Sequence, residues 1–288
     1  MPELPEVETV RRGLRELILG KVVKSENHDT DKGFPNAPHD VSEFLIGASI
    51  TDVRRRAKVL LIDLSTDYTL VIHLKMTGQL VYRGEQVFGA GHPNDSLIGT
   101  LPDRSTRVTL AFTDQSHLYF NDQRKFGWMR LMPTLEVPNI DFMKKVGPEP
   151  LEAEFTAEEF AARFTRRGKS SIKAALLDQT VVAGVGNIYA DESLWGAKIH
   201  PKRLVNTVTA DEFVLLYTEL RAVMNLAIEK GGSTDKNYVN AEGKRGSYMD
   251  FARVFRREGL VCPRCGAEII KFKAAGRGTH ICPVCQVQ

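Results

Sequence analysis

The sequence begins MPELPEVE, so removal of the initiator methionine would leave Pro2 as the first residue. The ring nitrogen of Pro2 would then be a secondary amine, which can attack an aldehyde carbon and form an iminium. An α-amino group titrates at about pH 8, so a usable fraction is unprotonated at neutral pH. Glu3 and Glu6 are the nearest carboxylates and could transfer protons. Many chains begin Met-Pro with frayed, solvated residues, so the rest of the sequence must decide whether this amine reacts.

Four cysteines near the other end of the chain could bind a metal ion. Cys262 and Cys265 form one Cys-x-x-Cys pair, Cys282 and Cys285 form another, and sixteen residues separate the two pairs. This spacing is in the range of a four-thiolate zinc site. Because four thiolates fill a tetrahedral shell and leave no position for water, we expect one structural Zn²⁺ that does no chemistry.

The segment between the cysteine pairs predicts a β-hairpin formed by residues 269–272 and 279–281, with Arg277 near its tip. Residues 244–288 contain nine basic and three acidic residues, a net charge of +6, while the rest of the chain nets about −3. A localised basic segment is typical of nucleic-acid binding, although a solvated charged surface has the same composition. Zinc ribbons also serve as protein-interaction modules, so the hairpin alone leaves its partner open.

The composition favours a globular protein with two cores. The chain has 288 residues, of which 42% are hydrophobic and 26% charged. It has no apolar run long enough to cross a membrane, and acidic residues stand where a secretory signal would be basic. We therefore expect no membrane segment and a cytoplasmic location, where cysteines favour metal over disulfides.

The elements that position these groups are predicted by hydrophobic periodicity. Val7, Val10 and Leu14 recur at helical spacing, so an amphipathic helix should hold the Pro2 amine against a folded body. Short β-rich runs from 59 to 132 predict a largely antiparallel domain. The Gly-, Pro- and Asp-rich stretch 84–103 is expected to be a surface loop.

Helical signals follow a linker that is predicted at 147–150. Thr156 with Glu159, and Thr209 with Glu212, fit the pattern in which a threonine caps a helix and a glutamate three residues later reaches back. The helix that begins after Thr209 should end at the glycine pair 231–232.

Three separated motifs stand out together: PELPEVE at 2–8, GVGNIYA at 184–190 and the four-cysteine ribbon. Further segments accompany them, namely RRAK at 55–58, HLKMTG at 73–78, DQRKFG at 122–127 and GPEPL at 147–151. In this order the set resembles the formamidopyrimidine-DNA glycosylase family, the MutM-type enzymes of base-excision repair. The resemblance covers the whole chain. It implies an α+β fold of three domains: an N-terminal catalytic antiparallel β-sandwich with a flanking helix at 1–146, a helical DNA-binding domain with a helix-two-turns-helix element at 147–255, and a β-hairpin zinc ribbon at 256–288.

The activity that the resemblance implies is that of a bifunctional DNA glycosylase and abasic-site lyase. Pro2 would attack C1′ of the deoxyribose, the damaged base would leave, and elimination of the 3′ and then the 5′ phosphate would follow. Glu3 would be the general acid or base. Glu6 would be a contact to the lesion or a structural partner near the N-terminus.

A damaged base must leave the stack before it can be reached, and the resemblance implies that Met76, Arg124 and Phe126 fill the gap. Phenylalanine can wedge between bases, methionine can fill an irregular void, and arginine can hydrogen-bond the orphaned partner base. Without the motif, Met76 and Phe126 would be assigned to core packing and Arg124 to a surface ion pair.

Lys58, Asn187 and Arg277 would bind the DNA backbone around the flipped nucleotide. Asn187 is expected at a helix N-terminus, where backbone amides bind phosphate, although Gly-x-Gly-Asn alone is more often a capping turn. The alternative for Lys58 is a solvated strand lysine. Some positions depart from the family pattern: the segment 104–107 replaces a frequent Lys-His pair and His280 a frequent aromatic. Residues 232–238 align with the region that covers an everted purine.

The expected substrates are oxidised purines, chiefly formamidopyrimidines and 8-oxoguanine opposite cytosine, in damaged double-stranded DNA. Endonuclease VIII-like glycosylases of oxidised pyrimidines usually begin MPEGPE, and Leu4 favours the purine enzyme. The third alternative is a non-catalytic zinc-ribbon protein that only binds DNA, which the Pro2-Glu3 pair disfavours. We expect a monomer that works in the cytoplasm, associated with the nucleoid.

Overall fold

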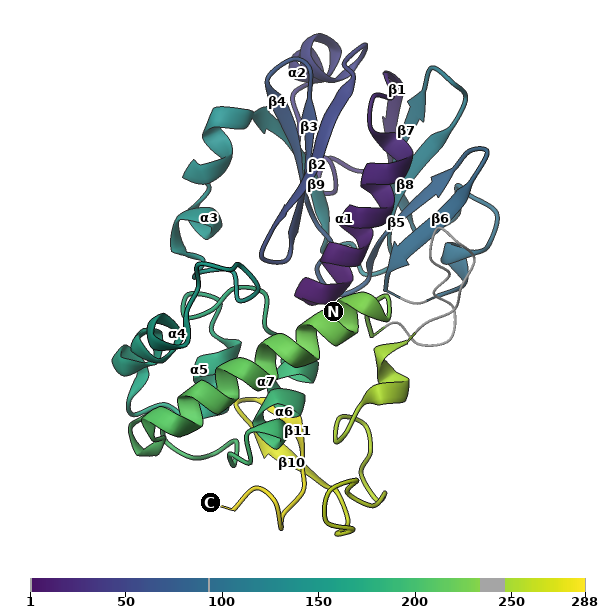
Figure 1. Ribbon diagram of the computed structural model, residues 1–288. Coiled ribbons are helices and arrows are strands. Elements are labelled where there is room, and N and C mark those ends of the chain that lie inside the picture. Colours follow the sequence, from purple (N-terminus) through teal and green to yellow (C-terminus); the bar gives the residue numbers. More distant parts are fainter. Residues whose placement is uncertain (1, 93, 234–246, 288) are drawn as a thin grey trace. The chain divides into compact units, whose positions relative to one another are not determined.

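The hydrophobic periodicity after Pro2 corresponds to the first helix of the computed structural model, α1 (Leu4–Ile18; Figure 1). The structure describes residues 2–92, 94–233 and 247–287. Val7, Val10 and Leu14 are fully buried. The predicted amphipathic helix is therefore confirmed.

Two antiparallel sheets follow α1 and form the predicted β-sandwich. The first sheet has the strand order β1-β7-β8-β5-β6, and the second has the order β2-β3-β4-β9. The strands are β1 (Val23–His28), β2 (Ile50–Arg56), β3 (Val59–Leu64), β4 (Tyr68–His73), β5 (Gly78–Arg83), β6 (Val87–Gly91), β7 (Thr106–Phe112), β8 (His117–Asp122) and β9 (Trp128–Pro133). Short helical turns lie between the strands: α2 (Pro38–Asp40), a π-turn (Val41–Leu45) and a 3-10 turn (Asp95–Leu97). A second 3-10 turn (Thr134–Asn139) and α3 (Asp141–Lys145) follow β9.

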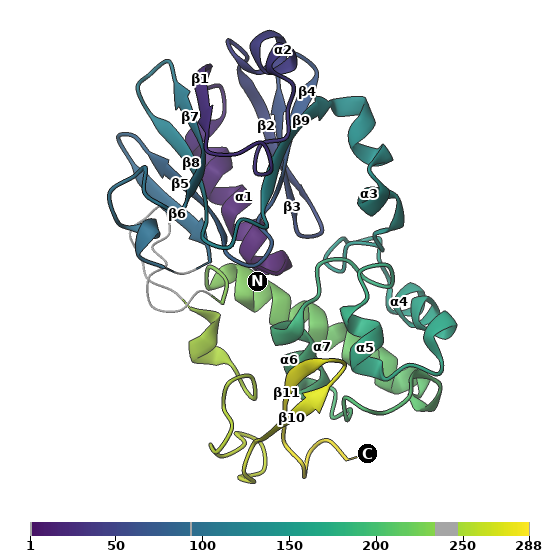
Figure 2. The same ribbon diagram turned by 180° about the vertical axis from the view of Figure 1, so that it is seen from behind.

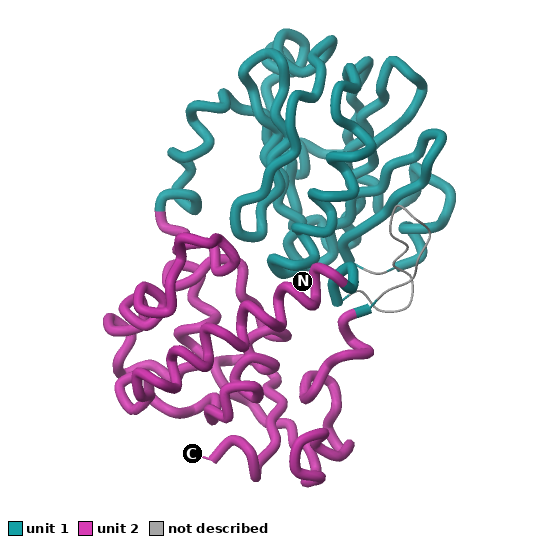
Figure 3. The backbone as a smooth tube through the Cα atoms, in the orientation of Figure 1, with its two compact units in different colours: residues 1–144, 230–247 teal, residues 145–229, 248–288 magenta. Residues whose placement is uncertain are grey.

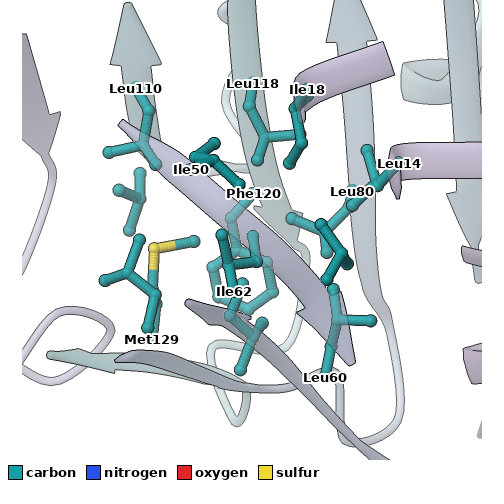
Figure 4. Close-up of a cluster of buried hydrophobic side chains, with 14 of the residues drawn as sticks. Leu14, Ile18, Ile50, Leu60, Ile62, Leu80, Leu110, Leu118, Phe120 and Met129 are labelled. Carbon is teal, nitrogen blue, oxygen red and sulfur yellow. The ribbon is translucent and has the colours of Figure 1, made fainter. Parts of the chain in front are cut away.

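One hydrophobic core lies between the two sheets and α1. Leu60 and Ile62 of β3, Leu80 of β5 and Phe120 of β8 meet Leu14 of the helix there (Figure 4). The helix contacts the edge strands β2 and β6, and so it covers the side of the sandwich where the two sheets are open (Figures 1 and 2).

The stretch 84–103 is not one surface loop, as the sequence suggested, because it contains β6. β6 pairs with β5 along its length and buries Phe88 against Gly13 of α1. A Cβ on Gly13 would lie 2.3 Å from Cε2 of Phe88. The high glycine content of the stretch masked the strand signal in the sequence. Because β6 pairs with the preceding strand β5, its backbone is not solvated as that of a surface loop would be.

The chain divides into two compact units (Figure 3), of which the first is Met1–Lys144 with Lys230–Ser247 and the second Lys145–Glu229 with Tyr248–Gln288. The predicted boundaries 1–146, 147–255 and 256–288 stay a prediction. Among the described helices, none combines the length and the apolar character needed to cross a lipid bilayer.

The second unit is helical and ends in a hairpin. Its helices are α4 (Ala157–Phe164), α5 (Ile172–Leu177), α6 (Asn187–Gly196) and α7 (Ala210–Glu229), with 3-10 turns at Thr165–Arg167, Val205–Thr207 and Tyr248–Phe251, and its strands are β10 (Ile270–Ala274) and β11 (Arg277–Ile281). Thr156 caps α4 by accepting the backbone N–H of Glu159 at 3.2 Å. Thr209 and Glu212 cap each other's backbone N–H groups at the start of α7. Both predicted threonine caps are confirmed, and the glutamate that reaches back is confirmed for Glu212.

A buried ion pair fastens the hairpin to the helices. Nζ of Lys173 in α5 lies 2.6 Å from Oδ1 of Asp191 in α6 and 2.7 Å from Oγ1 of Thr279 in β11, and the side chains of both charged residues are fully buried. The other oxygen of Asp191 accepts the backbone N–H of His280 at 2.9 Å and lies 3.2 Å from its ring Nδ1. Two neighbouring helices and a strand far along the chain therefore share one buried polar cluster.

We expect Gly13→Val to destabilise the first unit, because the added side chain would have to displace the buried ring of Phe88. Overpacking of this kind costs about 1–3 kcal/mol. Urea denaturation followed by circular dichroism measures the change. Glu16→Val is the matched control, since Glu16 is exposed on the same helix and surface changes stay within about 0.5 kcal/mol. Equal stability of the two variants would contradict the packing described.

We expect Asp191→Asn to destabilise the second unit by about 3–5 kcal/mol, because Lys173 would keep a buried charge without its counter-ion. Replacing the pair together, Lys173→Met with Asp191→Leu, should recover much of this loss. Denaturation followed by the fluorescence of Trp195, a residue of the same unit, reports it. Asp52→Asn, which breaks an exposed pair with Arg15, should change stability by less than about 1 kcal/mol.

Candidate active site

The strand register brings three predicted site segments to one edge of the sandwich. Val59 pairs with His73, and His73 pairs with Trp128, so the β2–β3 turn, the end of β4 and the start of β9 form one row. Gly78 of β5 pairs with Asp122 of β8 in the other sheet. The β4–β5 loop and the β8–β9 loop therefore cross between the sheets side by side, and Lys58 lies in the turn at the same edge.

The first turns of α1 lie near that edge as well. Nε of Arg55 in β2 donates to the carboxylate of Glu8 at 3.2 Å, and its Nη1 donates to the carbonyl of Ala57 at 2.9 Å. Ala57 directly precedes Lys58 and has a φ of +51°, a left-handed conformation that reverses the chain there. This ion pair ties the helix to the turn that carries Lys58.

The residues after Pro2 are fixed by hydrogen bonds at the helix start. Glu6 accepts the backbone N–H of Glu3 at 2.7 Å, and the side chain of Glu3 accepts the backbone N–H of Glu6, which is a reciprocal capping box. Both carboxylates are buried, at 4% and 5% exposure. Pro2 is also buried and directly precedes this fixed turn in the chain.

Glu6 has a second partner far along the chain. Its Oε1 accepts the backbone N–H of Ser233 at 2.8 Å, and a Cβ on Gly232 would lie 3.2 Å from Cγ of Glu6. The glycine at 232 has a φ of +89° and lets the chain pass close to the helix. Glu6 therefore has structural partners, while its contact to a lesion stays a prediction, as does the covering function of 232–238, of which 234–238 lie outside the described residues.

Basic residues surround a neutral histidine at this edge. Lys58 is 6% exposed, so it is not a solvated strand lysine. Burial, with the charges of Lys75 and Lys58, lowers the pKa of His73 to about 3. His73 accepts the backbone N–H of Lys75 at its Nδ1, 3.1 Å away. An imidazole that stays neutral near two ammonium groups leaves a positive edge suited to an anion.

The three residues predicted to enter DNA lie on the two crossover loops. Phe126 is 47% exposed and Arg124 is exposed, whereas Met76 is partly buried. The guanidinium of Arg124 lies over the ring of Phe126, 4.7 Å from its centroid, an arrangement that pairs a cation with an aromatic face. Phe126 is therefore not a core residue, and Arg124 has an aromatic partner in place of a surface ion pair.

In the second unit, Asn187 and Arg277 are brought close by one hydrogen bond. Asn187 is the first residue of α6, and its Nδ2 donates to the carbonyl of Gly278 at 3.0 Å. Gly278 follows Arg277, which is exposed at the start of β11. Ala275 and Gly276 both have positive φ, the geometry of a two-residue hairpin turn. The predicted hairpin with Arg277 near its tip is confirmed.

The four cysteines form a site that fits one zinc ion. Their sulfur atoms lie within 4.8 Å of one another, with 4.0 Å between Cys262 and Cys285 and 3.4 Å between Cys265 and Cys282. Tetrahedral zinc with bonds of about 2.3 Å needs sulfur atoms about 3.8 Å apart. The backbone N–H of Cys285 donates to the sulfur of Cys282 at 3.4 Å, which favours the thiolate. Four thiolates leave no open position, so the zinc is structural.

Sequence reasoning missed Lys173, Asp191 and Arg107 as residues that support the site. Lys173 stands in the apolar run 172–177, and a lysine there is a signal for a buried partner. Arg107, noted only as a departure from the family pattern, is 5% exposed and donates to the carboxylate of Asp29. Its partner lies far away in sequence, which no local pattern reveals.

Three family models match consecutive parts of the chain. They describe the formamidopyrimidine-DNA glycosylase N-terminal domain (residues 1–129), the H2TH domain of the same enzymes (146–238) and a zinc finger found in FPG and IleRS (259–287). A formamidopyrimidine-DNA glycosylase of Pediococcus pentosaceus is 43% identical over 287 residues, covering 100% of this chain and 99% of the relative.

Solved structures agree with this match. The wild-type Lactococcus lactis Fpg (MutM) in complex with a DNA that contains N7-benzyl-Fapy-dG is similar with a TM-score of 0.87 and 36% identity, covering 100% of both chains. The Lactococcus lactis Fpg with an abasic site containing DNA has the same TM-score and identity, covering 99% of this chain and 100% of that one. With motifs, fold and zinc ligands in agreement, the chain belongs to the formamidopyrimidine-DNA glycosylase family.

Proposed function

We propose that Pro2 is the nucleophile with which this DNA glycosylase and abasic-site lyase of base-excision repair removes oxidised purines. The observation that carries the proposal is the fixed helix start, where Pro2 precedes a capping box of two buried glutamates at the edge that also presents Lys58 and the two crossover loops. A secondary amine in this setting has acid and base groups within reach.

The reaction follows from the chemistry of that amine. The nitrogen attacks C1′, the bond to the damaged base breaks, and the base leaves with a proton that Glu3 supplies. The C1′–O4′ bond of the sugar ring then breaks, O4′ takes up the proton that the nitrogen loses, and the nitrogen lone pair forms the iminium with C1′. The resulting iminium makes the C2′ proton acidic, so its removal expels the 3′ phosphate, and a second elimination expels the 5′ phosphate. These steps use an amine and carboxylates, and the zinc ion stabilises the ribbon that Cys262, Cys265, Cys282 and Cys285 form.

Met76, Arg124 and Phe126 would fill the gap that the everted nucleotide leaves. An exposed phenylalanine beneath a guanidinium presents a flat surface that can enter a base stack. Arg124 would then hydrogen-bond the partner base. Eversion costs roughly a few kcal/mol, and these insertions offset it.

Lys58, Asn187 and Arg277 would bind phosphates of the damaged strand, and Glu6 would contact the lesion from the capped helix turn. The hydrogen bond from Asn187 to Gly278 supports a shared role for Asn187 and Arg277. We place the protein in the cytoplasm, associated with nucleoid DNA, since damaged double-stranded DNA is the partner that these residues suit.

For Pro2, we expect borohydride to trap a covalent adduct between the mature N-terminus and DNA containing 8-oxoguanine. Glu3→Gln should slow base release by roughly 10²- to 10⁴-fold, because it removes a general acid or base, while Glu16→Gln on the exposed face of α1 should not. Mass spectrometry of the trapped peptide locates the bond. An N-terminal extension should abolish trapping, and normal cleavage by an extended protein would falsify the assignment of Pro2.

For the substrate, we expect faster excision of 8-oxoguanine opposite cytosine than of thymine glycol. The measurement is single-turnover cleavage of two duplexes of identical flanking sequence that differ only in the lesion. Preference for thymine glycol would favour the endonuclease VIII-like alternative. Binding to both duplexes without cleavage of either would leave the non-catalytic alternative.

A further inference from the structure

A single buried carboxylate lies between the two crossover loops of the first unit. Asp122, the last residue of β8, is fully buried. In the described part of the chain its carboxylate forms no ion pair with a lysine or arginine, and its hydrogen-bond partners are all N–H or O–H donors of the two loops. A buried carboxylate without a cation is costly unless such donors satisfy it.

The donors are the neighbours of the three intercalating residues. One oxygen of Asp122 accepts the hydroxyl of Thr77, the residue after Met76, and the backbone N–H of Arg124 at 3.1 Å. The other accepts the backbone N–H of Phe126 at 2.8 Å and that of Gly127 at 2.7 Å. One side chain thus connects the Met76 loop with the Arg124–Phe126 loop.

The conformation of the second loop needs this support. Lys125, between Arg124 and Phe126, has a φ of +56°, a left-handed conformation that costs free energy in a non-glycine residue. At Gly127, a Cβ would lie 2.7 Å from the ring of Phe120 and 3.2 Å from the Asp122 carboxylate. The backbone N–H groups of Arg124 and Phe126, on either side of Lys125, both donate to Asp122. The carboxylate therefore stabilises this turn conformation.

Hydrogen bonds with Ser105 and Arg107 hold the backbone of Asp122 in place. Its backbone N–H donates to the carbonyl of Ser105 at 2.7 Å, and its carbonyl accepts Nε of Arg107 at 2.9 Å. Arg107 is buried and also donates to Asp29 and to the carbonyl of Arg104. The segment that departs from the family pattern therefore forms the support behind the carboxylate.

We propose that Asp122, backed by Arg107, is a positioning residue that presets Met76, Arg124 and Phe126 for entry into the DNA helix. The proposal rests on the proposed function, in which these three residues fill the gap left by the everted nucleotide. Asp122 touches no reacting atom and acts through the two loops. Because Phe126 is half exposed, the backbone of its turn, which Asp122 holds, and the guanidinium over its ring orient it.

Loss of this positioning should therefore slow the reaction only on substrates whose base must be everted. A duplex lesion requires insertion of the three side chains, whereas an abasic site in a single strand has no stack to open. Asp122→Asn keeps the shape of the side chain but turns an N–H₂ group toward N–H donors. The loops should lose their preset geometry while Pro2, Glu3 and Glu6 stay in place.

The test compares two substrates for each variant. For Asp122→Asn, single-turnover excision of 8-oxoguanine from duplex DNA should fall by about 10- to 100-fold, the effect of displacing positioning groups by about 1 Å. Borohydride trapping on a single-stranded abasic oligonucleotide should stay within about twofold of the wild-type protein. A 2-aminopurine beside the lesion should report a slower fluorescence change on eversion.

Controls separate positioning from folding. Asp114→Asn removes a carboxylate that also caps a turn, through N and Oγ of Ser116 on the β7–β8 turn, and that pairs with Lys21. This variant should leave the rate on both substrates unchanged. Thr77→Val should slow duplex excision less than Asp122→Asn does, and Thr77→Ser should restore it. If Asp122→Asn fails to fold, this Thr77 pair decides the proposal.

Each result has one meaning. Equal losses on both substrates, or no loss on the duplex, would overturn the positioning role of Asp122. Failure of the wild-type protein to be trapped on either substrate would instead overturn the proposed function. A loss confined to the duplex supports the inference.

Discussion

The pairing of β4 with β9 in one sheet and of β5 with β8 in the other is the constraint on which the first unit depends. It forces the chain to cross twice between the sheets at one edge, through two short loops. The β2–β3 turn joins the same row by register, and the Arg55–Glu8 pair brings the start of α1 toward it. Short crossovers have few conformations to lose, so groups far apart in sequence meet at little entropic cost.

In each unit, a buried polar group supports a segment that carries exposed side chains. In the first unit, Asp122 lies behind the loops that carry Arg124 and Phe126. In the second, the Lys173–Asp191 pair lies behind the strand that begins with Arg277. A two-stranded hairpin is marginally stable by itself, and here a zinc site at its open end and this buried pair at the middle of β11 anchor it. Buried polar clusters of this kind tolerate few alternatives, because every member must be satisfied.

Several of these features lower the stability of the fold in order to hold particular side chains in place. Phe126 keeps nearly half of its surface in solvent, and Lys125 adopts a left-handed conformation, both unfavourable in an isolated fold. Gly13, which admits the ring of Phe88 against α1, removes a side chain from the middle of a helix and lowers its propensity. The cores between the sheets and among the helices supply the apolar burial that offsets such costs.

The sequence by itself determined the elements with local signals: the amphipathic helix after Pro2, the caps at Thr156 and Thr209, the hairpin around Arg277 and the four zinc ligands. Spacing and capping are short-range properties, and so they can be read along the chain. Motif resemblance added the family, and with it Lys58, Met76, Arg124, Phe126 and Asn187. Only the tertiary structure decided that β6 is a strand, that Arg107 supports Asp122, and that Lys173 meets Asp191 and Thr279. The burial of β6 against α1 and the contact of Lys173 with Thr279 join residues far apart in sequence. Packing and hydrogen-bond geometry in a buried environment select these contacts, and no periodicity along the chain encodes them.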